Sequence, residues 1–387
     1  MDRKKALPVL FLVMFLVMVG FGIIIPVMPF YAEELGASPT ELGLLMAVYS
    51  LMQLLFAPMW GRISDRVGRK PIIMTGILGL AISFFLMAMS TELWMLFAAR
   101  VIGGFLSAAN MPTVMAYVAD ITSDEDRGKG MGIIGASVGL GFIFGPAIGG
   151  IFAKSNLNTP FYLAGAVSLI TFLLVLFVLK ESLTAEQRGA SRGEGSPSLL
   201  KAFSGPVTAL FILQLFVSLS LAGLEATFAY FAAEKARLGT VELGYIFMIM
   251  GLAGAIVQGG LVGRLTHKLG EGAVIQLGIV ISAIGFALIL MTSGFTTAAL
   301  FLTVFGIGNG LIRPSVSSLL TKKSAAGHGS TTGLLSSFDS LGRIAGPPLG
   351  GWLFSIAIGL PYISGIILSG IALILYRVYR ARSFETA

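Results

Sequence analysis

Cysteine is absent from this sequence, histidine occurs only twice, and charged residues make up 12% of the 387 positions. The missing thiols exclude disulfides and thiolate chemistry. The sequence also lacks a metal-ligand spacing, a phosphate-binding loop and a nucleophile elbow, so neither a soluble catalytic site nor a cofactor is predicted.

Apolar residues are abundant: they make up 56% of the chain, and the mean hydropathy is +0.90. A soluble domain carries about 25% charged residues, and a soluble core could not hide this much apolar surface. The solvent is therefore predicted to be largely lipid. The net charge of +7 is interpreted as basic loops between membrane spans and not as a nucleic-acid surface.

Twelve apolar segments follow one another, most of them close to the length of about 20 residues that one helix needs to cross a bilayer. They lie at 7–31, 40–60, 71–90, 93–119, 128–152, 160–179, 204–232, 242–262, 273–292, 296–320, 329–355 and 359–379. The first is expected to remain as a span, because no small-residue cleavage site interrupts it. The segments do not alternate in period two, so helices are predicted and not a barrel.

The positions of Lys and Arg predict the orientation. Of the 26 such residues, 20 lie in segments on the N-terminal side of the membrane, 3 lie on the opposite side, and 3 lie inside spans. This bias predicts that both termini are cytoplasmic. The polar stretch 181–203 has the composition of a flexible linker, and it would join a six-helix bundle at 1–180 to a second one at 204–387.

One glycine-proline pattern occurs twice, with every member of the second copy 201 residues after the first. The copies comprise Gly132, Gly141, Gly145, Pro146, Gly149 and Gly150, and Gly333, Gly342, Gly346, Pro347, Gly350 and Gly351. Such a duplication is typical of transporters built from two related bundles. Proline removes a helix hydrogen bond and glycine lets a neighbouring backbone approach, so the pattern predicts bendable contacts or simple close packing.

The stretch after the second span reads Gly61-Arg62-Ile63-Ser64-Asp65-Arg66-Val67-Gly68-Arg69-Lys70. Its glycines allow a tight turn, and by its charge alone it could be only a basic topogenic loop. Together with the glycine-proline pattern, the twelve spans and the central linker, it resembles the signature of the major facilitator superfamily. The resemblance covers essentially the whole chain, and within that superfamily it is strongest to the drug:proton antiporters of the NorA/Bmr group.

The resemblance implies an all-α integral membrane protein with the major facilitator fold, whose twelve transmembrane helices form two pseudo-symmetric bundles. It implies a monomer in a bacterial cytoplasmic membrane that exports amphipathic, often cationic drugs by alternating access, driven by proton entry. Lipid surrounds such a protein, and neither a cofactor nor nucleic acid is implied. A cytoplasmic gate that includes the start of the eleventh span would be held by Gly61, Asp65, Arg66, Gly68, Arg69 and Asp120. The fifth span would be a kinked helix at the bundle interface.

Five charged residues are predicted inside spans, namely Arg100, Glu225, Arg313, Asp339 and Arg343. A charge at mid-bilayer costs at least about 2.5–3.5 kcal/mol, so these residues should face a cavity or each other, and they are candidates for proton coupling. Glu225 is a candidate carrier or a structural ion-pair partner. Asp339 lies one helical turn before Arg343, which predicts a salt bridge within the helix or an exchange of partners with Arg313. Arg100 is linked to proton handling by the resemblance, or is a structural anchor.

The chain departs from the family pattern at one acid. The acidic residue that those exporters carry three positions before an Arg-Pro pair falls here on Gly310, so Asp339 could replace it in space. Substrate-binding candidates, chosen as aromatic, methionine or polar residues suited to a promiscuous cavity, are Met18, Phe21, Tyr49, Gln53, Phe142, Glu225 and Phe228. Two alternatives remain: a transporter of the same fold for one substrate class, such as tetracycline, a sugar or a lipid-linked sugar, and a membrane enzyme or receptor, ranked last.

Overall fold

The computed structural model describes residues 3–123, 125–184, 207–323 and 328–385, and every regular element in these ranges is a helix, as predicted. The chain divides into two compact units. Unit 1 contains the described residues of 1–36 and 48–194, and unit 2 contains those of 37–47 and 195–387. Most of the predicted linker at 181–203 lies outside the described residues.

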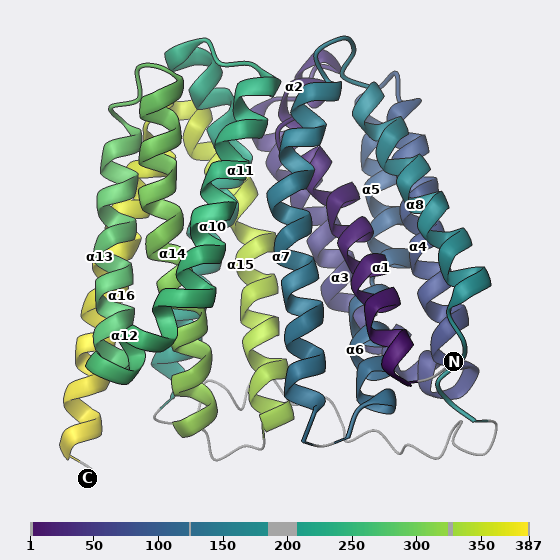
Figure 1. Cartoon of the computed structure of the whole chain (residues 1–387). Coiled ribbons are helices and arrows are strands. Elements are labelled where there is room, and N and C mark those ends of the chain that lie inside the picture. Colours follow the sequence, from purple (N-terminus) through teal and green to yellow (C-terminus); the bar gives the residue numbers. More distant parts are fainter. Residues whose placement is uncertain (1–2, 124, 185–206, 324–327, 386–387) are drawn as a thin grey trace. The chain divides into compact units, whose positions relative to one another are not determined.

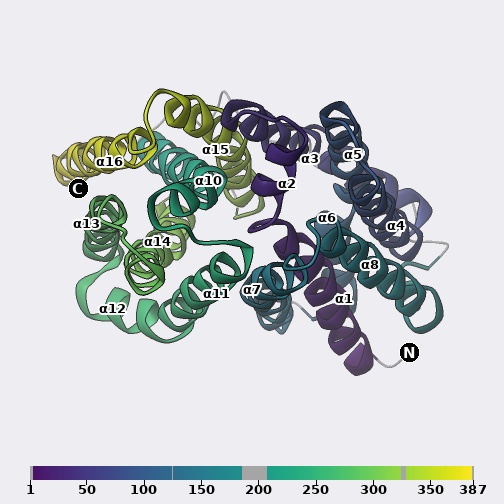
Figure 2. The same cartoon turned by 90° about the horizontal axis from the view of Figure 1, so that it is seen from above.

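The helices of unit 1 run roughly parallel to one another (Figure 1). They are α1 (Arg3–Ile24), α2 (Met28–Glu34), most of α3 (Pro39–Val67), α4 (Arg69–Ala88), α5 (Leu93–Ser107), α6 (Asn110–Ile121), α7 (Arg127–Phe152) and α8 (Thr159–Val178). Seen along the helices, α1 lies beside α7 and α8, and α4 lies beside α5 and α8 (Figure 2).

Unit 2 repeats this arrangement with the second half of the chain. It contains α10 (Thr208–Ala236), α11 (Thr240–Ile256), η1 (Val257–Leu261), α12 (Val262–Leu269), α13 (Glu271–Ile289), α14 (Phe295–Lys323), α15 (His328–Ile356) and α16 (Leu360–Glu385). The tightest partners are α13 with α14 and α10 with α15, which corresponds to α1 with α7 in unit 1.

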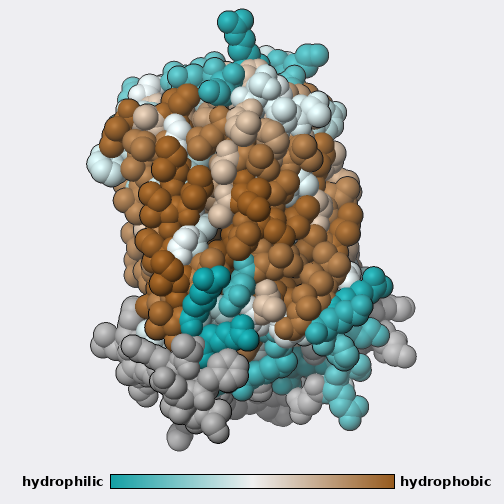
Figure 3. All heavy atoms as spheres, turned by 90° about the vertical axis from the view of Figure 1, so that its left-hand side faces the viewer, coloured by the Kyte–Doolittle hydropathy of each residue, from teal (hydrophilic) through white to brown (hydrophobic). Residues whose placement is uncertain are grey.

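Eleven helical stretches of the described residues are long and apolar enough to cross a membrane. In this count α5 and α6 together form one stretch, and α11, η1 and α12 together form another. The remaining long helix is α15, with 29 residues, and it falls outside this set. Its sequence carries Asp339, Arg343 and several serines, which lower its hydropathy. On the α13 and α16 side of unit 2, hydrophobic residues form a broad band with hydrophilic residues at both ends (Figure 3).

Three of the predicted spans contain interruptions. The first is broken at 25–27, around Pro26, and the fourth is broken at 108–109, where the ring nitrogen of Pro112 cannot donate to the carbonyl of Ala108. The eighth contains the π-helical turn η1, which includes Gly259 and Gly260. Breaks of this kind are tolerated in membrane helices because neighbouring groups satisfy the freed backbone.

The predicted loop at 61–70 is shorter than expected, because α3 continues to Val67 and α4 begins at Arg69. Only Gly68 interrupts the two helices, with a φ of +119° that favours glycine. The same turn recurs at Gly270, where φ is +80°, between α12 and α13. The charges that made residues 62–67 resemble a loop do not prevent a helix, since arginine is a good helix former.

Candidate functional site

Four charged residues of unit 2 form one connected group, which we call the charge cluster: Glu225 on α10, Arg313 on α14, and Asp339 and Arg343 on α15. Arg313 donates a hydrogen bond to Asp339. The Nε of Arg343 lies 3.3 Å from Asp339 Oδ2, and its Nη1 lies 4.0 Å from Glu225 Oε2. Two carboxylates and two guanidiniums balance in charge, which lowers the free energy needed to hold them within the membrane.

The two acids of the charge cluster differ in how they are held. Asp339 accepts hydrogen bonds from both arginines, from the hydroxyl of Ser218, and from Gln214 Nε2 at 3.1 Å. The carboxylate of Glu225 accepts no hydrogen bond within the described part of the chain, and the side chain is 19% exposed. Asp339 is therefore fixed by four donors, whereas no donor of the described residues occupies the acceptor sites of the Glu225 carboxylate.

Both of the pairings predicted for Asp339 are present. Its i,i+4 partner on α15 is Arg343, and it also contacts Arg313 of α14. The position that carries an acid in the resembled family is Gly310, one helical turn before Arg313. Asp339 thus supplies a carboxylate to Arg313 from α15, and its replacement of a family acid at position 310 stays a prediction.

A second ionic group lies in unit 1 at the turn between α3 and α4, and we call it the gate cluster: Ser64, Asp65, Arg69, Asp120 and Glu181. The guanidinium of Arg69, only 7% exposed, lies 2.6 Å from Asp65 Oδ1 and 3.1 Å from Asp120 Oδ2. It also donates to Ser64 Oγ at 2.6 Å. Three of the predicted gate residues, Asp65, Arg69 and Asp120, are therefore in direct contact.

Glu181 lies at the start of the segment predicted to be the linker, and no site role was predicted for it. Its carboxylate accepts from the backbone N–H groups of Arg69 at 2.8 Å and Lys70 at 3.1 Å, and so caps α4. A Cβ on Gly68 would lie 2.5 Å from Glu181 Oε2, so this position needs glycine for space as well as for its φ. Ser182 adds a hydrogen bond to Asp120 at 2.8 Å.

Of the three remaining predicted gate residues, Gly68 forms the turn described above, and Arg66 and Gly61 take no part in the ion pairing. Arg66 is exposed, and no ion pair within the described residues joins it to Asp65. Gly61 lies on α3, where a Cβ would meet only Pro112, at 3.9 Å.

Aromatic residues predicted to bind substrate meet in unit 1, and we call Phe21, Tyr49 and Phe142 the aromatic cluster. The ring centroid of Phe21 lies 5.5 Å from that of Tyr49 and 5.8 Å from that of Phe142. All three side chains are partly exposed. The guanidinium carbon of Arg100 lies 4.5 Å from the Tyr49 ring centroid, a distance suited to a cation–π contact.

Polar groups hold one edge of the aromatic cluster. The Tyr49 hydroxyl lies 2.8 Å from Ser107 Oγ, and Gln53 Nε2 donates to Ser107 Oγ at 2.9 Å. Met18 packs against α7 at Gly141. Phe228 differs from the other candidates: it is fully buried in unit 2 against Phe247, so its ring has no face exposed to a substrate.

The duplicated glycines line a close contact inside each unit. In unit 1, a Cβ on Gly141, Gly145 or Gly149 would lie 2.2–2.9 Å from atoms of α1. In unit 2, a Cβ on Gly342 or Gly346 would lie 2.4–3.1 Å from atoms of α10. These glycines therefore pack α7 against α1 and α15 against α10. The bundle-interface role expected for the fifth span stays a prediction. Within the pattern, Pro146 lies inside α7, Gly150 is buried, and Gly132 faces open space.

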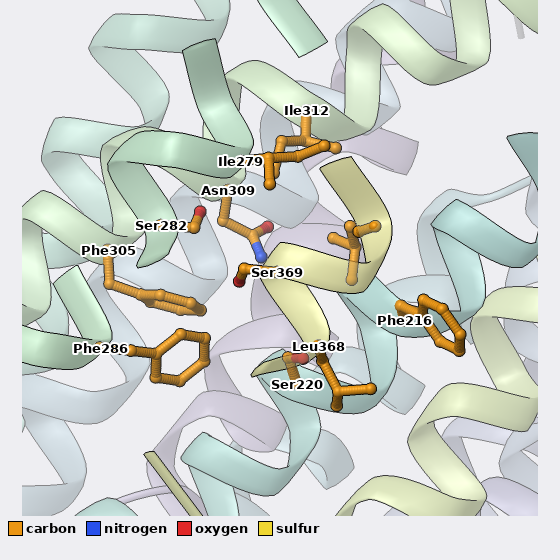
Figure 4. Close-up of a pocket in the computed structure, with 12 residues that line it drawn as sticks. Phe216, Ser220, Ile279, Ser282, Phe286, Phe305, Asn309, Ile312, Leu368 and Ser369 are labelled. Carbon is orange, nitrogen blue, oxygen red and sulfur yellow. The ribbon is translucent and has the colours of Figure 1, made fainter. Parts of the chain in front are cut away.

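A small cavity of about 20 Å³ lies between α10, α13, α14 and α16. Asn309, Ser220 and Ser369 supply polar groups to a wall that includes Phe286 and Phe305 (Figure 4). This volume suits a single water molecule, whereas drug-sized ligands occupy about 300–1,000 Å³. It is therefore not a drug-binding pocket.

The fold and these sites define a polytopic membrane transporter built from two related halves. The sequence matches the profile of the Major Facilitator Superfamily over residues 10–328 and 261–386. It is 32% identical to Multidrug resistance protein 2 of Bacillus subtilis (strain 168), over all of this chain and 98% of that protein. It is 31% identical to Quinolone resistance protein NorA of Staphylococcus aureus (strain MSSA476), over 99% of each chain.

The chain belongs to the Major Facilitator Superfamily, whose members are membrane transporters and not enzymes. A crystal structure of nucleoside transporter NupG has the same fold, with a TM-score of 0.79 at 16% identity over 98% of this chain and 99% of that one.

Proposed function

We propose that this chain exports amphipathic, often cationic drug-like compounds from a bacterial cell in exchange for protons. The observation that carries the proposal is the difference between the two acids of the charge cluster. Asp339 has four hydrogen-bond donors, while Glu225 faces one guanidinium at 4.0 Å and is partly exposed. The multidrug and quinolone resistance named in the relatives supports the substrate class.

Glu225 would be the group that couples the two flows. Its carboxylate can be neutralised by a proton or by a bound cation, and one carboxylate cannot hold both. Protonation removes its attraction for Arg343, which Asp339 then holds alone. Release of either ligand would restore the negative charge of Glu225 opposite Arg343, between α10 and α15, and this change would favour reorientation of the transporter.

The remaining candidates have supporting parts in this scheme. The aromatic cluster, with Met18 and Gln53, offers partly exposed rings and polar groups to a flat, amphipathic compound. Arg100 would tune that surface through Tyr49. The gate cluster would close the cytoplasmic side of the transporter. Both termini would lie on this same side, because 20 basic residues flank the spans there and only 3 flank them on the opposite side. The expected gate contact with the start of the eleventh span stays a prediction.

The test uses everted membrane vesicles that contain the protein and are energised to an acidic lumen. Ethidium should accumulate in the vesicles, and a protonophore should stop its uptake. Glu225→Gln should abolish proton-driven uptake at an unchanged expression level. Glu234→Gln, which alters an exposed carboxylate on the same helix α10, should leave uptake intact.

Undiminished uptake by Glu225→Gln would reject its role as carrier. Uptake that survives the protonophore would reject proton coupling. A transporter dedicated to one substrate class is the competing function. It would be favoured if chemically unrelated cations fail to move while a single compound class does.

A further inference from the structure

A cavity of about 350 Å³ lies at one end of unit 2, where α12 meets α13 and where α14 and α16 approach their last residues. Its wall includes Leu269, Leu319, Lys323, Tyr376, Tyr379 and Arg380. No member of the charge cluster lines it. The transport scheme above therefore leaves this cavity without a role.

The wall carries an excess of positive charge. Lys323 and Arg380 are exposed cations at the ends of α14 and α16. Glu271 also lines the cavity, but its carboxylate already accepts hydrogen bonds from Lys322 and from Ser318. Two cations and one acid therefore line the cavity, and this balance favours an anionic ligand.

The turn that borders the cavity has a counterpart that binds an anionic group. Gly270 and Gly68, 202 residues apart, both adopt a positive φ at the start of a long helix. In unit 1, the first N–H groups of that helix donate to the carboxylate of Glu181 at 2.8 and 3.1 Å. In unit 2, no acid from another helix of the described residues caps α13 at Gly270, and the first turn borders the cavity.

Apolar and aromatic groups complete the wall. Leu269 is 56% exposed, which is unfavourable in water but favourable against an acyl chain. Tyr376 and Tyr379 are largely buried, with rings facing the apolar interior. A Cβ on Gly272 would lie 2.2 Å from the Tyr376 hydroxyl, so this glycine keeps the hydroxyl beside the first turn of α13. Tyrosine is enriched at the level of lipid headgroups for the same amphipathic reason.

We propose that this cavity binds the phosphate group of an anionic phospholipid. Lys323 and Arg380 would contact the phosphate, and the exposed face of Leu269 would contact the first part of an acyl chain. A free phosphate ion shares the anionic chemistry but gains nothing from the apolar wall. Basic pockets between membrane helices bind anionic lipid headgroups by this combination of charge and apolar contact. The proposal does not depend on the transported substrate.

The test is native mass spectrometry of the delipidated full-length protein, titrated with phosphatidylglycerol, phosphatidylcholine or inorganic phosphate. Phosphatidylglycerol should bind at least tenfold more tightly than phosphatidylcholine. Lys323→Gln with Arg380→Gln should weaken phosphatidylglycerol binding about thirtyfold, since each cation contributes about 1 kcal/mol near a charged headgroup. Arg264→Gln, which removes an exposed cation of α12 outside the cavity wall, should bind like the parent.

Gly272→Ala provides a second variant that keeps every charge. Its new Cβ collides with the Tyr376 hydroxyl, so displacement of the ring into the cavity should also weaken lipid binding. The assignment is overturned if the double variant binds like the parent, or if Arg264→Gln loses as much affinity. It is also overturned if inorganic phosphate binds as tightly as phosphatidylglycerol, which would indicate an ion site without a lipid.

Discussion

Replacing Asp339 with asparagine should destabilise unit 2 by about 3 kcal/mol, because the amide keeps the size of the side chain but loses its charge. A hydrogen bond to a charged group contributes about 1.5–3 kcal/mol, and Asp339 makes two with guanidiniums. The side chains of Asp339, Arg313 and Arg343 are 21%, 33% and 32% exposed, so the lower end of that range applies to each bond.

Moving the carboxylate from position 339 to position 310 tests whether the lost charge causes the loss of stability in Asp339→Asn. A Cβ on Gly310 would find its nearest heavy atoms at 3.6–3.7 Å, an ordinary contact distance, so the Cβ of an aspartate fits there. Gly310 lies three residues before Arg313 on α14, within reach of a side-chain pair. Gly310→Asp alone adds an unbalanced acid and should destabilise the protein. In combination with Asp339→Asn it should restore at least half of the lost stability.

The measurement is equilibrium unfolding of the four proteins in detergent, followed by circular dichroism. A coupling energy above about 1.5 kcal/mol between the two substitutions, beyond the usual error of additivity, is expected. If the free energy of unfolding of Asp339→Asn lies within about 0.5 kcal/mol of that of the parent, a range typical of neutral surface changes, the carboxylate does not hold the two arginines. Additive effects in a well-folded double variant would also contradict the reasoning.

Two further predictions use contacts in unit 1. Gly145→Ala should lower the melting temperature of the detergent-solubilised protein, because its Cβ meets the backbone of α1 at 2.7 Å, while Gly132→Ala, with open space around it, should leave the melting temperature unchanged or slightly raised. Equal effects of the two alanines would exclude close packing as the role of the motif. Glu181→Gln should lower stability by about 1 kcal/mol through loss of a charged helix cap. Ser182→Ala serves as its neighbouring comparison and should have a smaller effect, since it removes one neutral donor.

The helical spans could be predicted from the sequence because their constraint is local. About 20 apolar residues must form a helix to cross lipid, since no other open structure satisfies the backbone there. The pairing of Asp339 with Arg343 could be predicted for the same reason, as their spacing places them on one face of one helix. The contact of Glu225 with this pair depends on tertiary packing and could not be predicted from local spacing, because Glu225 lies more than a hundred residues earlier in the chain.

The role of Glu181 could not be predicted from composition. It begins a polar stretch, and its function depends on the N–H groups of α4 more than a hundred residues earlier. One signal was present: a glycine that ends one helix and directly begins another leaves the N–H groups of the second helix in need of an acceptor. The extent of α3 was underestimated because charges at 62–67 resemble a loop, although a helix can extend beyond the bilayer into water.

The duplication preserves packing but not chemistry. Gly22 and Gly223 are related by the 201-residue repeat, and each accepts close contacts from the glycines of its partner helix. Applying the same offset to the charge cluster, Arg343 corresponds to Phe142 of the aromatic cluster, and Asp339 corresponds to Val138. Equivalent positions on α7 and α15 thus carry a ring in one unit and an ion pair in the other. A packed glycine contact tolerates little change, whereas the residues beside it can diverge. The two halves could therefore keep the same helix packing, while unit 1 came to carry the aromatic cluster and unit 2 the charge cluster.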